Sequence, residues 1–446
     1  MSRVKSKSEA LNLKKLIIML LFTALFLFIF KMGYYVTLPF IDSKFQTEID
    51  FGFINAISGG ALQHFSILCL GISPYITASI VVQLLQMDII PVFKEWGEEG
   101  ESGKQKLNQV TRYMAIGLAI VQSLILVIGV DNSYNGLYWT TRALETSKAI
   151  KYIYLAIVAT GGTAFCLWLA ELITKHGIGN GTSMLICAGI LASFPNMIKS
   201  LVSTYISTEE TRNIGLFIFV IVMLLLIIVF IVFMEAAQRK IPIQYANRPA
   251  AASFRGKNDS NIPIKLNSAS VIPVIFASTL MSLPTTIIQL VKGNDSSQLE
   301  GGALILYRIF STTYTTSEGV TKLNVGGFSL YILLIFIFSF FYSFLQMNPE
   351  KMSDNLQKQN AYIPGVRPGE DTTSYISRVL FKITMIGATY LTLVAIIPIL
   401  LTVIFQLPTS VTIGGTSLII VVGVAVETAL QLKTQQQDKQ YRGFME

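Results

Sequence analysis

Residues 214–235 read IGLFIFVIVMLLLIIVFIVFME, an apolar run that reaches its first charged residue only at Glu235. A helix of this length rises about 30 Å, which matches the hydrocarbon thickness of a bilayer. No face of such a helix offers side chains that water could hydrogen-bond. The stretch therefore predicts a membrane-spanning helix and places the chain in a bilayer.

The composition of the whole chain agrees with a membrane protein. Of its 446 residues 52% are hydrophobic and only 13% are charged, which is too few to cover soluble cores of this size. The formal net charge of +8 suits loops that face anionic lipids or acidic partners. Three cysteines, Cys69, Cys166 and Cys187, lie in apolar stretches without metal-binding spacing, so we expect them to be packing residues.

Further stretches of about 20 mostly apolar residues recur along the chain. An even number of spans places both termini on one side of the membrane. Basic residues outside the spans divide 24 to 9 between the two sides, and the positive-inside rule assigns the richer side, with both termini, to the cytoplasm. Ten transmembrane helices are predicted, at residues 16–38, 66–88, 112–130, 152–174, 182–202, 214–235, 268–291, 328–346, 376–406 and 410–431.

The ten spans divide into two halves of five. An odd number of crossings inverts the second half relative to the first, so a central pathway between the halves is plausible. Two long basic loops, 235–267 and 348–375, are the natural docking surfaces on the cytoplasmic side. The predicted units are a tail at 1–15, an N-terminal half at 16–202, a C-terminal half at 203–432 and a tail at 433–446.

One apolar segment is too short to cross the membrane. Residues 51–65 read FGFINAISGGALQHF and are interrupted by Gly59 and Gly60. We interpret the segment as a re-entrant helix, which is tolerated at membrane depth only inside protein or along a water-filled cavity. The alternative is an amphipathic helix that lies on the outer lipid surface.

The sequence offers no catalytic, cofactor-binding or metal-binding motif. His64 and His176 are its only histidines, and neither HExxH nor GxSxG occurs. The segment 97–105, GEEGESGKQ, misses the phosphate-loop spacing by one residue and has Gln105 where Ser or Thr would hold magnesium. We therefore expect neither an enzyme nor a nucleotide-binding protein.

Seven stretches, quoted with their positions, resemble the SecY family of protein-conducting channels, and in particular its Gram-positive members. Any one of them could arise by chance, but seven in family order along most of the chain form a specific signal. They are SGGALQHFSILCLGISPYITASIVVQLLQMDIIP (58–91), KLNQVTRY (106–113), GIGNGTSM (177–184), QRKIPIQYA (238–246), VIPVIFAS (271–278), NPEKMSDNLQKQNAYIPGVRPG (348–369) and GGTSLIIVVGVAVET (414–428).

The resemblance implies an all-α polytopic fold of two inverted five-helix halves with a pore between them. The re-entrant segment would be a plug, and a lateral gate would release transmembrane segments into lipid. The function implied is passage of unfolded, signal-bearing polypeptides across a bacterial plasma membrane. Family members work with the small subunits SecE and SecG and receive substrate from the SecA ATPase or the ribosome, so the energy source lies in a partner.

The resemblance also assigns a pore ring of apolar side chains. A narrow apolar ring excludes water when closed and accepts an extended chain without side-chain preference. An isoleucine in a membrane helix otherwise faces lipid or another helix. Thr182 departs from the family's usual apolar residue. The ring residues are Ile72, Ile76, Thr182, Ile186, Ile275 and Ile420.

Three further sets of residues follow from the motifs. Gly59 and Gly60 would be the hinge of the plug. Neutral polar residues are candidates for the lateral gate, because their hydrogen bonds can close a seam and exchange partners; ordinary helix packing is the alternative. These candidates are Thr77, Ser79, Gln83, Gln122, Ser278, Thr279 and Ser282, and the residues expected to dock SecA or the ribosome are Arg239, Lys240, Lys351, Lys358 and Arg367.

Two other functions stay open at this point. One is an accessory SecY paralogue that serves a few dedicated substrates, against which the intact docking motifs argue. The other is a solute transporter or flippase, which would need a convergent polar site for a small ligand. Only Glu171 and Glu427 are carboxylates inside the spans, apart from those at a span's last residue, and both lie close to cytoplasmic helix ends.

Overall fold

Long helices dominate the structure, a computed structural model that describes residues 2–41, 52–86, 90–134, 147–206, 214–245, 260–292, 301–316, 320–407 and 409–442. Each predicted span has a helical counterpart among these residues. In the N-terminal half these are α1 (Ser2–Tyr34), α3 (Ser73–Leu85), α5 (Glu101–Tyr134), α7 (Lys148–His176) and α8 (Gly181–Tyr205). In the C-terminal half they are α9 (Ile214–Ala236), α10 (Ile272–Lys292), α12 (Val325–Gln346), α14 (Glu370–Phe405) and α15 (Thr409–Arg442).

Eight of these helices are long and apolar enough to cross a bilayer, counting only the described residues. The other two are α3, a shorter apolar helix, and α15. Helices suit this environment because every internal backbone N–H and C=O is satisfied within the segment, where lipid offers no partner. The prediction of an all-α polytopic membrane protein is confirmed.

The second predicted span, 66–88, begins too early. Residues 58–72 form successive turns, and helix α3 starts only at Ser73. Gly71 adopts a left-handed φ of 52°, which breaks helical geometry, and Pro74 lies in the first turn of α3, where its missing N–H costs nothing. Apolar composition could not separate these turns from the helix that follows.

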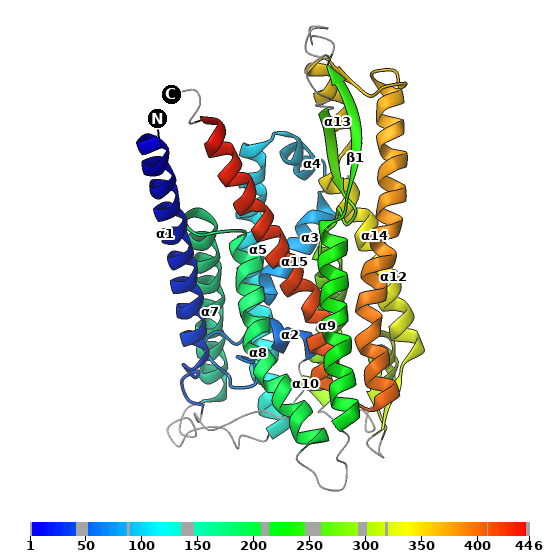
Figure 1. Cartoon of the computed structure of the whole chain (residues 1–446). Helices are drawn as coiled ribbons and strands as arrows, with labels where there is room; N and C mark the ends of the chain where they lie inside the picture. Colours follow the sequence, from blue (N-terminus) through cyan, green and yellow to red (C-terminus); the bar gives the residue numbers. More distant parts are fainter. Residues whose placement is uncertain are drawn as a thin grey trace.

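The re-entrant segment contains one short helix, α2 (Gly52–Ile57). Its side chains are buried, with Phe53 7% and Ile57 3% exposed. It contacts α8, α10 and α15 and lies at mid-height in the bundle (Figure 1). The alternative of a helix lying on outer lipid is therefore wrong, and residue 51 of the predicted segment lies outside the described residues.

The two halves pack within themselves and across one central seam. Helix α5 contacts α3 and α7 in the first half, while α12 contacts α10 and α14 in the second. Contacts of α10 with α3 and α5, and of α15 with α8, join the halves. Both termini lie at the end of the bundle that also carries β1 and α13 (Figure 1).

The two predicted docking loops contain regular structure that their basic composition concealed. Strand β1 (Gln238–Tyr245) pairs antiparallel with β2 (Ser260–Lys265), and its far end pairs with β5 (Ala361–Tyr362). Helix α13 (Pro349–Lys358) precedes β5. Residues 246–259 of the first loop lie outside the described residues. The remaining elements are α4 (Pro91–Glu98), α11 (Gly302–Phe310), β3 (Thr313–Thr315) and β4 (Thr321–Leu323).

Glycine allows α7 to lie directly against the turns that precede α3. A Cβ on Gly162 would lie 2.0 Å from the carbonyl oxygen of Ile67, closer than any real contact. The neighbouring Gly161 has nothing within 4 Å of the corresponding position. Gly162 therefore sets the distance between α7 and the segment that leads into the pathway.

Replacing Gly162 with valine is expected to destabilise the protein by about 1–3 kcal/mol, because the backbone must move to accommodate the side chain. The thermal midpoint of the detergent-solubilised protein, followed by size-exclusion chromatography, measures the loss. Gly161→Val is the matched control, since it has the same helix propensity and open space. Equal losses in both variants would contradict this account of the packing.

Candidate functional site

Five predicted ring residues belong to one hydrophobic cluster that draws on helices of both halves. Ile72 and Ile76 come from the start of α3, Ile186 from α8, Ile275 from α10 and Ile420 from α15. All five are buried, with between 0% and 7% of each side chain exposed, and all belong to one hydrophobic cluster. Four helices from both halves thus contribute isoleucine to one apolar cluster.

The sixth predicted ring residue, Thr182, has a different setting. It lies in the first turn of α8, one helical turn before Ile186, and is half-buried. Its backbone N–H and its hydroxyl both donate to Oδ1 of Asn180, over 3.1 and 2.8 Å. Asn180 is the N-cap of the helix, so the Thr182 hydroxyl takes part in capping.

Helix α2 seats directly on the isoleucine cluster. Phe53 and Ile57 of α2 belong to the same hydrophobic cluster as the ring isoleucines. On its other side α2 approaches α8 so closely that a Cβ on Gly189 would lie 2.0 Å from the carbonyl oxygen of Ile57. The short helix therefore covers the apolar contact and is itself enclosed by the bundle.

The turn after α2 depends on its two glycines. Gly59 and Gly60 have φ angles of +70° and +85°, a region that other residues avoid. A Cβ on Gly59 would lie 3.3 Å from the backbone of Gly189. The left-handed φ angles of both residues, and the close approach of α8 to Gly59, require glycine at these positions.

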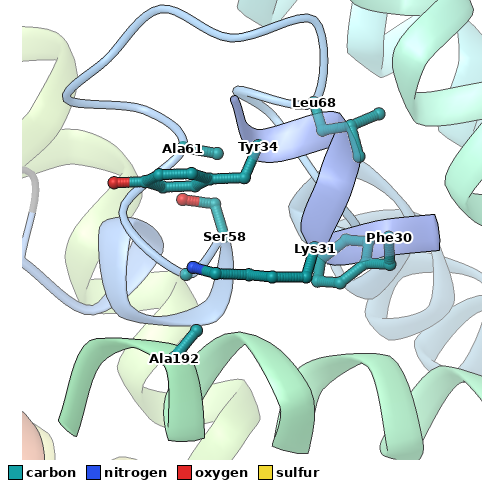
Figure 2. A pocket seen from close by; sticks show the side chains of 8 residues that line it. Phe30, Lys31, Tyr34, Ser58, Ala61, Leu68 and Ala192 are labelled. Atoms are coloured by element: carbon teal, nitrogen blue, oxygen red, sulfur yellow. The ribbon is translucent and has the colours of Figure 1, made fainter. Parts of the chain in front are cut away.

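An aromatic contact from α1 holds the same turn from the opposite side (Figure 2). The Tyr34 ring lies against Gly60 and meets the His64 ring edge-on, with centroids 5.1 Å apart. The Lys31 ammonium lies 4.0 Å from the centroid of the Tyr34 ring, a cation–π distance. Lys31 and Tyr34, together with Ser58 and Ala192, line a small cavity beside this turn.

Backbone hydrogen bonds also join the chain that follows α1 to the residues that follow the glycine turn. The N–H of Leu38 donates to the carbonyl of Phe65, and the N–H of Ile67 donates to the carbonyl of Val36, each over 2.8 Å. The chain after α1 and the chain after the plug turn are therefore paired. The motifs did not predict this role for α1, although a lysine inside a span, Lys31, is a recognised signal of a functional position.

The lateral-gate candidates lie on helices that meet at the seam, yet their hydrogen bonds do not cross it. Gln83 donates to Ser79 within α3 over 3.0 Å. Ser278 of α10 pairs with the hydroxyl of Tyr331 of α12 over 3.2 Å, inside its own half. The remaining candidates with hydrogen bonds donate to backbone carbonyls one turn earlier in their own helix: Thr77, Thr279 and Ser282.

The side chains at the seam between α10 and the pair α3 and α5 are mostly apolar. Leu283 of α10 packs against the cluster that contains Leu126 and Val127 of α5. Ile80 of α3 and Met281 of α10 belong to the larger cluster with the ring isoleucines. Gln122 of α5 is half-buried beside this region. The seam is thus apolar in this conformation, and the polar groups are held within their own helices or halves.

The predicted docking residues gather on a small platform at the end of the bundle that carries the termini. Its hydrophobic core includes Ile241 of β1, Ile264 of β2 and Leu356 of α13, packed on the start of α14. Lys351 donates to the carbonyl of Gly97, in the last turn of α4, over 3.3 Å. All five basic side chains are exposed: Arg239, Lys240, Lys351, Lys358 and Arg367.

Comparisons with known proteins point to one family. The SecY family model matches residues 66–429. The chain is 43% identical to "Protein translocase subunit SecY" of Staphylococcus carnosus (strain TM300) over 430 residues, with 95% of each protein covered. It is 40% identical to the protein of the same description from Bacillus licheniformis, with 99% of each covered.

Solved channel structures share the fold. The structure described as "The structure of a protein conducting channel" superimposes with a TM-score of 0.65 at 18% identity, covering 94% of this chain and 93% of that one. The structure described as "Sec61 in the Canine ribosome-channel complex from the endoplasmic reticulum" gives 0.63 at 16% identity, with 94% and 93% covered. At such identities the likeness concerns the fold alone.

Replacing Tyr34 with alanine is expected to loosen the plug turn, because it removes an edge-on aromatic contact and a cation–π contact worth about 1–2 kcal/mol together. A cysteine at the buried position Ala61, in a chain whose native cysteines are changed to alanine, should react about tenfold faster with a membrane-impermeant thiol reagent. Tyr34→Phe keeps the ring and should protect the cysteine.

Phe28→Ala is the control for this measurement, since Phe28 lies on α1 but is 63% exposed. It should leave the reaction rate at the wild-type value. Equal rates for Tyr34→Ala and the wild type would show that α1 does not hold the turn.

Proposed function

Because the chain belongs to the SecY family, we infer that it is the protein-conducting channel of a Sec translocase, and we propose that polypeptides cross between its two halves. The observation that carries the proposal is the isoleucine contact at the centre of the bundle. Five isoleucines from four helices lie there in one buried hydrophobic cluster, which also includes Phe53 and Ile57 of α2. Separating the halves would open a path lined by side chains with no preference for particular residues of the substrate.

The same contact would act as the membrane seal. Apolar groups around a narrow constriction favour its dewetted state, so ions cannot cross while the halves are closed. Helix α2 would be the plug and Gly59–Gly60 its hinge. Thr182 would add a slightly polar rim one turn from Ile186, with its hydroxyl occupied by Asn180.

We propose that the lateral gate lies between α10 and the pair α3 and α5, whose contacts join the halves. Apolar packing holds this seam in the closed conformation. A signal sequence that enters the seam would replace those apolar contacts with its own, and the polar groups of α3, α5 and α10 could then change partners. Transmembrane segments would leave sideways into lipid by this route.

The basic platform is the proposed docking face for SecA and the ribosome, and SecE and SecG are the proposed small subunits. Exposed arginine and lysine side chains steer acidic partners and fix their orientation. SecA would supply the energy from ATP, so that this subunit acts as a conduit without a catalytic step of its own. The platform and both termini would then face the cytoplasm of a bacterial cell, with the channel in the plasma membrane.

The platform also bears on the two other functions. An accessory paralogue for a few substrates would have no need of a complete docking face, and five exposed basic residues here share one folded core. A transporter or flippase would gather polar groups at the centre of the bundle, where this chain has isoleucine. General polypeptide passage is therefore the function we propose.

Replacing Ile76, Ile186 and Ile275 together with serine is expected to make resting channels leak ions. Hydroxyl groups hold water where butyl groups exclude it, and a shift of about 1.4 kcal/mol toward the wetted state raises its population tenfold. Precursors with weakened signal sequences should also cross more readily, because the closed state loses part of its stabilisation. Conductance per channel in planar bilayers measures the leak.

The matched control changes Ile218, Leu225 and Val229 of α9 to serine, since each is more than half exposed on the bundle surface. Those changes should lower the amount of inserted protein and leave each channel tight. A ring variant that is scarce but does not leak would show that the ring is misplaced.

Replacing Arg367 with glutamate is expected to slow SecA-driven transport of a precursor into vesicles by about tenfold, with the protein folded as before. The side chain is exposed, so charge reversal weakens docking without disturbing the core. Arg308→Glu on α11, which follows the opposite end of α10, is the control and should transport normally. Normal transport by Arg367→Glu with SecA limiting would contradict the assignment of the platform.

A further inference from the structure

A buried polar pair lies at the root of the β1–β2 hairpin, outside the pathway and the basic platform. Glu235 is in the last turn of α9, just before β1, and only 5% of it is exposed. Asn267, 3% exposed, follows β2 and precedes α10. The Asn267 Nδ2 donates to Glu235 Oε1 over 2.6 Å. A carboxylate is costly to bury unless it is hydrogen-bonded, so this pair fixes the two ends of the hairpin to each other.

The same asparagine also shapes the start of α10. Its amide group donates a second hydrogen bond to the carbonyl of Ser270, over 2.9 Å. Ser270 has a φ of +55°, a left-handed conformation that serine rarely adopts. Both N–H donors of Asn267 are therefore used, one toward α9 and one toward the strained turn that leads into α10.

The backbone around the pair is fixed on two further sides. The N–H of Leu266 donates to the carbonyl of Ala237 over 2.9 Å, which extends the β1–β2 ladder to the helix ends. A Cβ on Gly387 of α14 would lie 2.9 Å from the carbonyl oxygen of Leu266. The root of the hairpin is thus seated against α14 and has little freedom to tilt independently of the helices.

The pair stands between two functional regions. Arg239 and Lys240 of the docking platform follow Glu235 by four and five residues and lie on β1, the strand that the pair anchors. Ile275 of the ring lies eight positions beyond Asn267, and α10 contacts α3 and α5 across the seam. Because the root is the covalent connection from β2 to α10, a tilt of the hairpin would act on α10 there.

We propose that Glu235 and Asn267 form a positioning clamp that transmits docking on the β1–β2 hairpin to α10 and so biases the opening of the seam. The proposal rests on the proposed function, because it takes the platform as the docking face and α10 as a gate helix. The two-state element is α10, whose position both the docked partner and the seam contacts bias.

The test uses the full chain with its co-purified small subunits in lipid vesicles, with native cysteines changed to alanine. Spin labels at Ile120 of α5 and Ile287 of α10, both more than a third exposed, report the distance across the seam. The wild type should shift toward the longer distance when saturating SecA and a non-hydrolysable ATP analogue are added. Glu235→Ala and Asn267→Ala should each reduce that equilibrium shift by about fivefold or more, the usual lower range of coupling between sites.

Three comparisons separate a clamp from general destabilisation. SecA affinity should stay within about twofold of wild type in both variants, because the hydrophobic core of the platform does not include the pair. Glu235→Gln keeps an acceptor oxygen and should retain the shift. Ser268→Ala is the matched control, since Ser268 is buried in the same loop but bonds only the nearby carbonyl of Lys265. The double alanine variant should be no worse than either single one.

The outcomes are distinguishable. A normal wild-type shift that Glu235→Ala retains would contradict the clamp, and so would a loss of SecA affinity equal to the loss of the shift, since the pair would then only support the platform. A wild-type channel that binds SecA without any shift at the seam would instead contradict the proposed docking and gating.

Discussion

The buried hydrophobic cluster that includes isoleucines from both halves and apolar side chains of α2 is the packing on which the rest of the structure depends. In the function we propose, this packing seals the centre of the bundle, and because it makes no permanent bond between the halves it can be broken and reformed. The same contact aligns α3, α8, α10 and α15, because each must bring its isoleucine to one place. A sealed membrane and an openable path are thus two states of one apolar interface.

The elements around this interface divide the remaining tasks. Helices α1 and α8 hold the plug turn through Tyr34 and Gly189, whereas the platform has a separate hydrophobic core built on β1, β2 and α13. Because the two hydrophobic cores are separate, a partner could bind the platform without disrupting the packing of the membrane helices. The short links between them would then carry the effect of docking to the path, and the base of the β1–β2 hairpin is one such link, held by the hydrogen bond from Leu266 to Ala237.

The helices of the bundle could be predicted from the sequence because membrane helices are recognised by long apolar runs, of which residues 214–235 are the clearest. Motif positions also selected five isoleucines that are buried in one cluster, although no periodicity distinguishes Ile275 from an isoleucine that faces lipid; their role as a pore ring stays a prediction. The turns at 58–72 were missed because apolar turns and apolar helices have the same composition. The β1–β2–β5 sheet and the Tyr34–His64 contact depend on residues far apart in the chain, which a single sequence without homologues does not connect.

The most direct measurement of the central claim is where a polypeptide in transit touches this protein. A photo-crosslinking residue placed at Ile76, Ile186 or Ile275 should form adducts with a precursor stalled midway through the membrane, and none without the precursor. The same residue at Val229, which is 66% exposed on α9, should react with lipid instead. Precursor adducts at Val229 with none at the three isoleucines would contradict passage through the isoleucine contact.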